Sequence, residues 1–150
     1  MNAPRLADLT TTAVGGPATR YLKAETEQQL VQAVAQADEV GEPVLIVGGG
    51  SNILASDHGF EGTVVHVATQ GIDVLDTDPA TGTLVTVQAG HSWDQAVLWS
   101  VEQGLAGLET LSGIPGTTGA TPVQNVGAYG TEVSQTIENV RTWDRQAGET

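Results

Sequence analysis

The residues with the clearest potential for binding chemistry lie in two glycine-rich stretches, and the first is Gly48-Gly49-Gly50-Ser51-Asn52. It directly follows the apolar run Pro43–Val47. Successive glycine N–H groups can form a concave nest for oxyanions, and the Ser51 hydroxyl and Asn52 amide can add donors. The sequence therefore predicts a phosphate-binding loop here, with a plain tight turn after a strand as the alternative.

Neither of the common phosphate-binding fingerprints fits this first stretch. A Walker loop needs a Lys-Ser/Thr pair, which does not follow, and the third glycine of a Rossmann fingerprint would fall at Ile53. The chain has a formal net charge of −13 and only five Lys and Arg residues. A phosphate bound here is therefore expected to be held mainly by backbone N–H groups and hydroxyls.

The second stretch is Gly113–Gly130, in which small residues alternate with a few apolar ones. Its expected apolar anchors are Ile114, Val123, Val126 and Tyr129, and two prolines fix the backbone φ angle. Small residues allow a backbone to approach a ligand closely, which suits a planar ring system. An irregular connection packed on its own core is the alternative.

Other classes of site are disfavoured by composition and spacing. The absence of cysteine excludes disulfides, thiolate metal sites, cysteine nucleophiles and cysteinyl-linked cofactors. The three histidines lack metal-ligand spacing, the carboxylates form no convincing acid–base pair, and no serine lies in a nucleophile elbow. The strongly acidic balance argues against nucleic acid or an anionic membrane surface as a partner.

The overall composition indicates one globular domain that we expect to be cytoplasmic. The chain has 150 residues, of which 39% are hydrophobic and 15% charged. The N-terminus lacks the apolar core of a signal peptide, and no apolar run approaches the roughly 20 residues of a membrane span. No membrane insertion is expected.

The elements that must position the first stretch form a small α/β unit ending near residue 68. Thr26 and Gln29 form a capping-box pattern, followed by apolar residues at helical spacing. The continuous apolar run Pro43–Val47 predicts a strand buried on both faces. Two further strands are expected at Arg20–Ala24 and Thr63–Val67.

The character of the sequence changes after residue 68. Turn-rich residues separate two expected strands, and Ser92 with Gln95 is a second capping-box pattern that should open a helix ending near Gly104. The remaining expected elements are strands at Ile72–Asp76, Thr83–Ala89 and Ile137–Trp143, a turn or short helix within Leu105–Leu111, and a hairpin turn at Arg145–Gly148. A partner strand would begin after this last turn, so we expect the chain to be the front part of a longer polypeptide.

Together the two stretches resemble the UDP-N-acetylenolpyruvoylglucosamine reductase family. The resemblance runs from about Leu9 to the last residue, and it rests on the order and spacing of blocks that would each be weak alone. These blocks are Thr11–Gly16, Val47–Leu54, Gly107-Leu108-Glu109, Gly113–Gly116 and Pro122–Gly130.

The resemblance implies an α+β fold of the vanillyl-alcohol oxidase and p-cresol methylhydroxylase type. It implies that residues 1–68 form a small α/β FAD-binding subdomain and that residues 69–150 begin a second one that is incomplete. It places Gly48, Gly49, Gly50, Ser51 and Asn52 on the FAD pyrophosphate, with Ile53 beside them. It places Ile114, Pro115, Gly116, Thr118, Gly119, Ala120, Val123 and Gly127 along the ribityl chain and isoalloxazine, and Gln124 on the substrate side.

The resemblance also implies the reaction. In the family, NADPH reduces FAD, and the reduced flavin passes hydride to the enolpyruvyl group of a UDP-sugar to give UDP-N-acetylmuramate for peptidoglycan synthesis. The family's catalytic serine, arginine and glutamate lie further along the chain, so no catalytic residue and no metal is expected here. Ser51 stands where covalent flavoproteins of this fold carry a histidine, so FAD is expected to be non-covalent. A non-catalytic flavin- or nucleotide-binding module and another oxidase of the fold are the alternatives.

Overall fold

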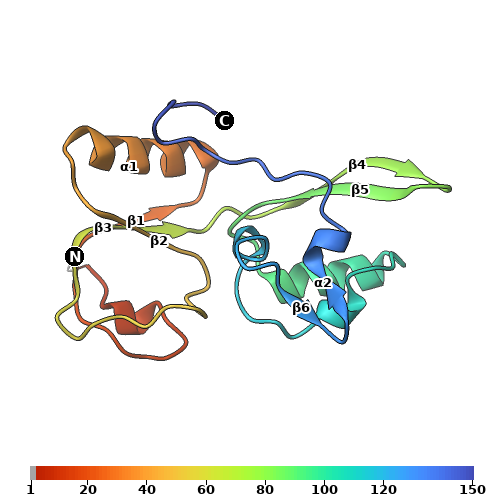
Figure 1. The fold of residues 1–150 in the computed structure, drawn as a ribbon, viewed down its shortest axis with the longest axis horizontal. Coiled ribbons are helices and arrows are strands. Elements are labelled where there is room, and N and C mark those ends of the chain that lie inside the picture. Colours follow the sequence, from red (N-terminus) through yellow and green to blue (C-terminus); the bar gives the residue numbers. More distant parts are fainter. Residues whose placement is uncertain (1–2) are drawn as a thin grey trace. The chain divides into compact units, whose positions relative to one another are not determined.

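The computed structural model describes residues 3–150, and residue contacts divide them into two units. The first unit comprises the residues up to Ala68 together with Arg141–Thr150, and the second is Thr69–Val140. The last ten residues thus group with the first unit and not with the stretch that precedes them. Figure 1 shows the elements of both units.

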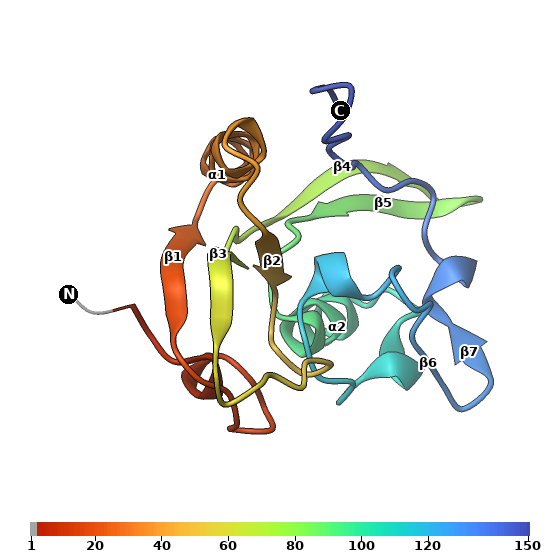
Figure 2. The ribbon, with the colours of Figure 1, turned by 60° about the vertical axis from the view of Figure 1, so that its left-hand side comes forward.

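The first unit contains a three-stranded parallel sheet with one helix. Its elements are β1 (Ala18–Ala24), α1 (Glu27–Glu39), β2 (Val44–Val47) and β3 (Phe60–Val67). The strand order is β1-β3-β2, so β3 is central and α1 belongs to the crossover between the two outer strands. Figure 2 shows the three strands side by side. The predicted strands and helix of this part are confirmed.

Helix α1 begins at the predicted N-cap Thr26, but the second bond of the predicted capping box comes from Glu25 and not from Thr26. The Thr26 hydroxyl accepts a hydrogen bond from the Gln29 backbone N–H at 3.2 Å, and the Gln29 side chain accepts one from the Glu25 N–H at 2.8 Å. The bond to Thr26 satisfies a backbone donor that the first turn of the helix cannot satisfy itself. The inner face of α1 buries Val34 against Val65 of β3.

The prediction that the second strand is buried on both faces is wrong. Of β2, only Val47 is fully buried, and Ile46 remains 47% exposed. The reason is the strand order, which places β2 at an edge and gives the central position to β3. Accordingly Val64 and Val65 of β3 are both 0% exposed, one on each face of the sheet.

The C-terminal residues contact α1 through two ion pairs. Arg141 lies 2.7 Å from Glu27 at the start of the helix, and Arg145 Nε donates to Asp38 Oδ2 at 3.0 Å near its end. The predicted turn over residues 145–148 is confirmed and is closed by a bridge between Asp144 and Glu149. The predicted strand over residues 137–143 is wrong, because no described strand pairs with it.

The second unit combines a β-hairpin, a helix and short irregular elements. β4 (Ile72–Asp78) pairs with β5 (Gly82–Val87), and α2 (Trp93–Glu102) follows. The rest comprises 3₁₀ helices at Glu109–Leu111, Thr118–Ala120 and Val133–Gln135 and the short strands β6 (Gly127–Ala128) and β7 (Thr131–Glu132). The predicted two strands, the helix and the short helix before residue 112 are confirmed.

The core of the second unit is centred on α2. Trp93 and Val97 of this helix pack with Leu111 and Val133, each at most 3% exposed. The predicted capping box at the helix start is wrong. The Ser92 side chain makes no capping hydrogen bond, and its backbone forms a bridge with Thr117.

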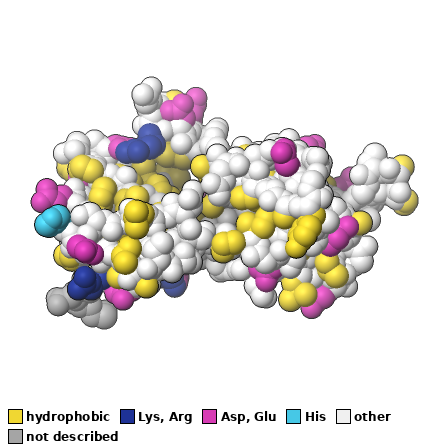
Figure 3. All heavy atoms as spheres, turned by 60° about the horizontal axis from the view of Figure 1, so that its bottom comes forward, with side chains coloured by type: hydrophobic (Ala, Val, Ile, Leu, Met, Phe, Trp, Pro, Cys, Tyr) yellow, Lys and Arg dark blue, Asp and Glu magenta, His cyan; other side chains and the backbone are white. Residues whose placement is uncertain are grey.

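The surface reflects the acidic composition. Figure 3 shows acidic side chains dispersed over the face in view, with basic side chains at only a few positions. Within residues 3–150, no helix has the length and apolar character needed to cross a membrane.

Candidate functional site

The first glycine-rich stretch lies at the carboxyl end of the parallel sheet. Gly48 follows the last residue of β2, Val47, whose register partner on central β3 is His66. In open α/β sheets ligands bind beyond the carboxyl ends of the strands, so the loop lies at the end of the sheet where a ligand is expected. The structure therefore brings the predicted residues Gly48–Ile53 together in one loop beside the sheet.

The loop is packed against the N-terminal segment through Gly50. Gly50 is buried with a φ of +66°, and a Cβ built on it would lie 1.9 Å from the Leu9 carbonyl oxygen. The Gly50 carbonyl accepts a hydrogen bond from the Thr11 N–H at 3.2 Å, and the Thr12 hydroxyl donates to the Ile53 carbonyl at 3.3 Å. Gly50 is therefore required, at least in part, by packing within the protein and not by contact with a ligand.

The N-terminal segment is itself locked to the residues after the loop. The Gly16 N–H donates to the Ser56 carbonyl at 2.8 Å, and a Cβ on Gly16 would lie 2.1 Å from the Asp57 carbonyl oxygen. Likewise a Cβ on Gly59 would lie 2.0 Å from the Pro17 carbonyl oxygen. Sequence reasoning missed this support, although the Gly15-Gly16 pair was a signal of close backbone approach.

The loop offers backbone donors for an anion. Gly48 and Gly49 lie in a bend directly after β2, and their consecutive backbone N–H groups lead into Gly50. Ser51 is half-buried and Asn52 exposed at the end of the same turn. Consecutive glycine N–H groups in a turn are the donors from which an oxyanion nest is built.

A hydrogen-bonded Tyr–His pair lies close to the same carboxyl end of the sheet. The Tyr21 hydroxyl is 2.9 Å from His66 Nδ1, and the two residues come from neighbouring strands β1 and β3. Partial burial, reinforced by the positive charge of Lys23, lowers the pKa of His66 below its ordinary value of 6.5. Sequence reasoning assigned this histidine an ordinary structural role, and its contact with a core-packed tyrosine agrees with that role.

The second stretch begins along a short segment that leads into α2. The Trp93 indole N–H donates to the Leu111 carbonyl at 3.0 Å, and the Trp93 backbone N–H donates to the Gly116 carbonyl at 3.1 Å. Further on, Thr118 donates to the His91 carbonyl through its N–H at 2.9 Å and its hydroxyl at 3.1 Å. The predicted residues Ile114–Gly119 are thus held in one fixed backbone path.

Gly119 makes the closest approach in this path. Its N–H donates to the Ala89 carbonyl at 2.8 Å, and a Cβ on Gly119 would lie 2.6 Å from the Ala89 Cβ. Gly90 behind it is fixed in turn, since its N–H donates to the buried Thr69 hydroxyl at 3.0 Å. The segment Ala89–Asp94 is therefore the support that sequence reasoning did not identify for this stretch.

Two of the four apolar anchors expected for the second stretch are confirmed, and two are wrong. Ile114 and Val126 pack against the Trp93 core. Val123 and Tyr129 do not anchor the stretch, because their side chains are 84% and 92% exposed. The reason for the second case is a tight hairpin between β6 and β7, with positive φ at Tyr129 and Gly130 that turns the ring outward.

Asn125 fixes the part of the stretch that precedes this hairpin. It has a φ of +47°, its Nδ2 donates to Glu132 Oε2 at 2.7 Å, and its Oδ1 accepts from the Ser134 N–H at 3.0 Å. A left-handed conformation at asparagine is tolerated when its side chain bonds locally. Gln124, Val123 and Gly127 are exposed around it.

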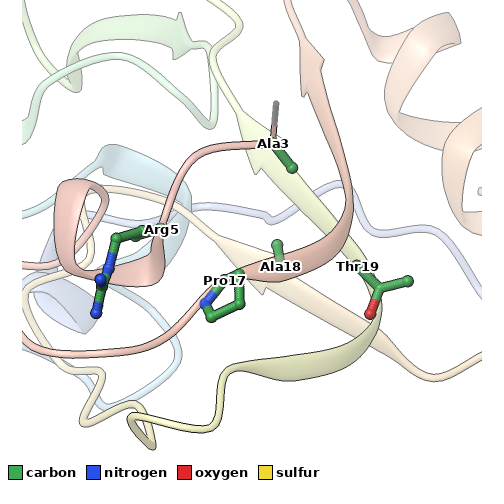
Figure 4. Close-up of a pocket in the computed structure, with 5 residues that line it drawn as sticks. All are labelled: Ala3, Arg5, Pro17, Ala18 and Thr19. Atoms are coloured by element: carbon green, nitrogen blue, oxygen red, sulfur yellow. The ribbon is translucent and has the colours of Figure 1, made fainter. Parts of the chain in front are cut away.

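The remaining described residues offer little further binding chemistry. No group of three or more His, Asp or Glu side chains within residues 3–150 could hold a metal ion. A shallow hollow lined by Ala3, Arg5, Pro17, Ala18 and Thr19 lies beside the start of β1, as Figure 4 shows. Its lining offers one guanidinium and one hydroxyl, and the Thr19 hydroxyl already donates to the Phe60 carbonyl at 3.3 Å.

Comparison with known proteins identifies close relatives of this chain. It is 54% identical over 145 residues to the UDP-N-acetylenolpyruvoylglucosamine reductase of Streptomyces coelicolor, covering 97% of this chain and 36% of the relative. It is 46% identical over 149 residues to the Thermobifida fusca protein of the same name, covering 99% of this chain and 41% of the relative. The chain therefore spans well under half the length of these relatives.

A solved structure and a family model agree with these relatives. The crystal structure of UDP-N-acetylenolpyruvylglucosamine reductase from Thermus caldophilus matches with a TM-score of 0.67 and 30% identity, covering 87% of this chain and 44% of the other. This match confirms the predicted α+β FAD-binding fold. A sequence model described as FAD binding domain matches residues 18–150. The chain therefore belongs to the FAD-binding domain family.

Proposed function

We propose that the protein is an FAD-dependent reductase that converts UDP-N-acetylglucosamine enolpyruvate to UDP-N-acetylmuramate with NADPH, in peptidoglycan synthesis. The observation that carries this proposal is 54% identity over 97% of the chain to a UDP-N-acetylenolpyruvoylglucosamine reductase. Since the chain spans 36% of that relative, it would supply the FAD-binding part of the enzyme. The UDP-sugar and NADPH are the proposed small-molecule partners, and because the reaction consumes two soluble nucleotides we expect it in the cytoplasm.

We propose that the first loop holds the FAD pyrophosphate. Gly48, Gly49 and Gly50 provide three consecutive backbone N–H groups, and Gly50 is fixed by its contact with Leu9. Ser51 and Asn52 continue the same turn. A preformed nest of this kind stabilises a dianion without cationic side chains, which suits a chain with five Lys and Arg residues. Ile53 would pack beside the cofactor.

We propose that the second stretch lies along the ribityl chain and isoalloxazine. Its hydrogen bonds to Ala89–Asp94 fix the backbone before any ligand arrives, so little conformational entropy is lost on binding. The residues that would contact the cofactor are Ile114, Pro115, Gly116, Thr118, Gly119, Ala120, Val123 and Gly127, with Gln124 on the substrate side. The two FAD-binding subdomains would be residues 1–68 and the stretch from residue 69, with Arg141–Thr150 packed on the first.

Bound FAD supplies hydride-transfer chemistry to such an enzyme. The residues of this chain would bind and orient the cofactor, and we assign none of them to catalysis. Ser51 at the loop position that carries a histidine in covalent flavoproteins, together with the lack of cysteine, supports non-covalent attachment. Acid precipitation should therefore release all flavin into the supernatant.

The enzymatic proposal is tested by a spectrophotometric assay of the purified full-length protein. NADPH should bleach the flavin absorbance near 450 nm anaerobically, and UDP-N-acetylglucosamine enolpyruvate should restore it. UDP-N-acetylglucosamine, which lacks the reducible double bond, is the matched control and should leave the flavin reduced. Reoxidation by neither UDP-sugar in a protein that binds FAD would contradict the proposed reaction while leaving the cofactor assignment standing.

A further inference from the structure

One acidic side chain lies at the start of the second stretch and makes no contribution to the FAD-binding residues named above. Asp94 is the second residue of α2 and is exposed. Its Oδ1 atom accepts two hydrogen bonds from the opposite segment, one from the Ser112 hydroxyl at 3.0 Å and one from the Gly113 N–H at 2.7 Å. A carboxylate here therefore bonds to another segment instead of capping its own helix.

These two bonds begin a ladder that continues along the stretch. Next to Asp94, the Trp93 N–H donates to the Gly116 carbonyl at 3.1 Å. The Thr118 and Gly119 N–H groups then donate to the carbonyls of His91 and Ala89. The Asp94 contact is the one in this ladder made by a side chain with a formal charge.

We propose that Asp94 is a positioning residue that fixes the backbone path of Gly113–Gly119, and through it the site for the flavin part of FAD. Gly113 has a φ of +78°, and a Cβ on it would meet nothing within 4 Å, so packing does not impose its conformation. The N–H bond to Asp94 supplies that constraint. Only the link to the flavin site rests on the proposed function. The effect of Asp94 on the backbone path can be measured without cofactor.

The negative charge of the Asp94 carboxylate matters because both of its donors, Ser112 and Gly113, are exposed to water. A hydrogen bond to an ionised acceptor is stronger than one between neutral groups and competes better with solvent. One oxygen accepts both bonds, so an asparagine side chain could retain them at reduced strength through its amide oxygen. An alanine side chain retains neither.

The first test is amide hydrogen exchange of the cofactor-free protein, comparing Asp94→Ala and Asp94→Asn with the native chain. Asp94→Ala should speed exchange at Gly113 and also at Thr118 and Gly119, whose own bonds do not involve Asp94. The exchange rates in Asp94→Asn should lie between those of Asp94→Ala and those of the native chain. Glu102→Ala, which removes an exposed carboxylate from the other end of α2, is the matched control and should leave all three amides unchanged. Unchanged exchange at Thr118 and Gly119 in Asp94→Ala would overturn the positioning role.

The second test is an FAD titration of the same variants followed by flavin fluorescence. Asp94→Ala should weaken FAD binding by about tenfold, Asp94→Asn by less, and Glu102→Ala hardly at all. Equal dissociation constants for Asp94→Ala and Glu102→Ala would overturn the link to the cofactor. If the native chain binds no FAD, the proposed function fails, and the exchange data still decide the role of Asp94 in the backbone path.

Discussion

A Cβ built on Gly50 would lie 1.9 Å from the carbonyl oxygen of Leu9, so the first glycine-rich loop and the N-terminal segment meet backbone to backbone. This contact gives Gly50 an intramolecular reason to be glycine. We therefore predict that Gly50→Ala lowers the free energy of unfolding by about 3 kcal/mol, from overpacking and positive φ together.

Gly41 provides the matched control for that prediction. Its φ of +67° is nearly the same as the +66° of Gly50, but a Cβ on Gly41 would meet nothing within 4 Å. Gly41→Ala should therefore cost only about 1 kcal/mol, the cost of the left-handed conformation alone. Urea unfolding of both variants measures the difference, and equal losses would show that the contact with Leu9 imposes no constraint.

The contact between Gly119 and Ala89 allows a test by compensation. Gly119→Ala should lower the free energy of unfolding by about 2 kcal/mol and weaken FAD binding, because a Cβ there would lie 2.6 Å from the Ala89 Cβ. Ala89→Gly in the same chain removes that carbon and should restore part of both losses. The double variant is compared with the two single variants by urea unfolding and FAD titration. Strictly additive losses would mean that the two residues do not compete for space.

His66 is expected to make stability depend on pH. Burial first, and Lys23 second, lowers the pKa of His66 in the folded state below 6.5, so the unfolded chain binds more protons between the two pKa values. The free energy of unfolding should consequently decrease as the pH falls through 6.5 and become constant below the folded pKa.

An NMR titration of the His66 ring measures this pKa directly. Lys23→Gln removes the neighbouring charge and should raise the pKa part of the way toward 6.5, because the larger cause, burial, remains. His66→Gln should remove the decrease in the free energy of unfolding that His66 causes as the pH falls below 6.5. A His66 pKa above 6.5 in the native chain would contradict the assignment.

The two arginine contacts to α1 predict how the C-terminal residues are held. Arg145 lowers the pKa of Asp38 by hydrogen bonding, and Arg141 lies 2.7 Å from Glu27. Replacing both arginines with alanine should raise the Asp38 pKa toward 3.8 and speed proteolysis within residues 141–150. Arg20→Ala, which removes an exposed ion pair with Glu42, should change neither. Unchanged cleavage in the double variant would assign the attachment to other contacts.

Local sequence patterns predicted much of the fold because they report local physics. The Thr26 cap and the apolar residues of α1 follow from helix geometry, and β3 follows from its run of apolar residues. Patterns that depend on a distant partner failed. The sequence could not show that β2 is an edge strand, that Ser92 pairs with Thr117, or that no described strand lies beside residues 137–143.

In the candidate site, too, the local patterns were predicted and the distant partners were not. Both glycine-rich stretches were predicted from their composition, and the structure adds the segments that hold them. Neither Leu9 behind Gly50 nor Ala89 behind Gly119 carries a sequence signal of its own, because each acts through a backbone that lies close in space and distant in the chain. Val123 and Tyr129 were misplaced for the related reason that an apolar side chain in a loop need not face a core.

The central claim is that this chain binds FAD through its two glycine-rich stretches, and a cofactor titration tests it most directly. FAD is added to apoprotein prepared by acid treatment and refolding, and flavin fluorescence is followed for the native chain, Gly49→Pro and Glu102→Ala. Gly49→Pro removes one N–H from the proposed nest, and Glu102→Ala alters an exposed position at the end of α2. We predict saturation at one FAD per chain, at least tenfold weaker binding in Gly49→Pro and unchanged binding in Glu102→Ala. A folded native chain that takes up no FAD, or equal affinity in all three proteins, would contradict the account.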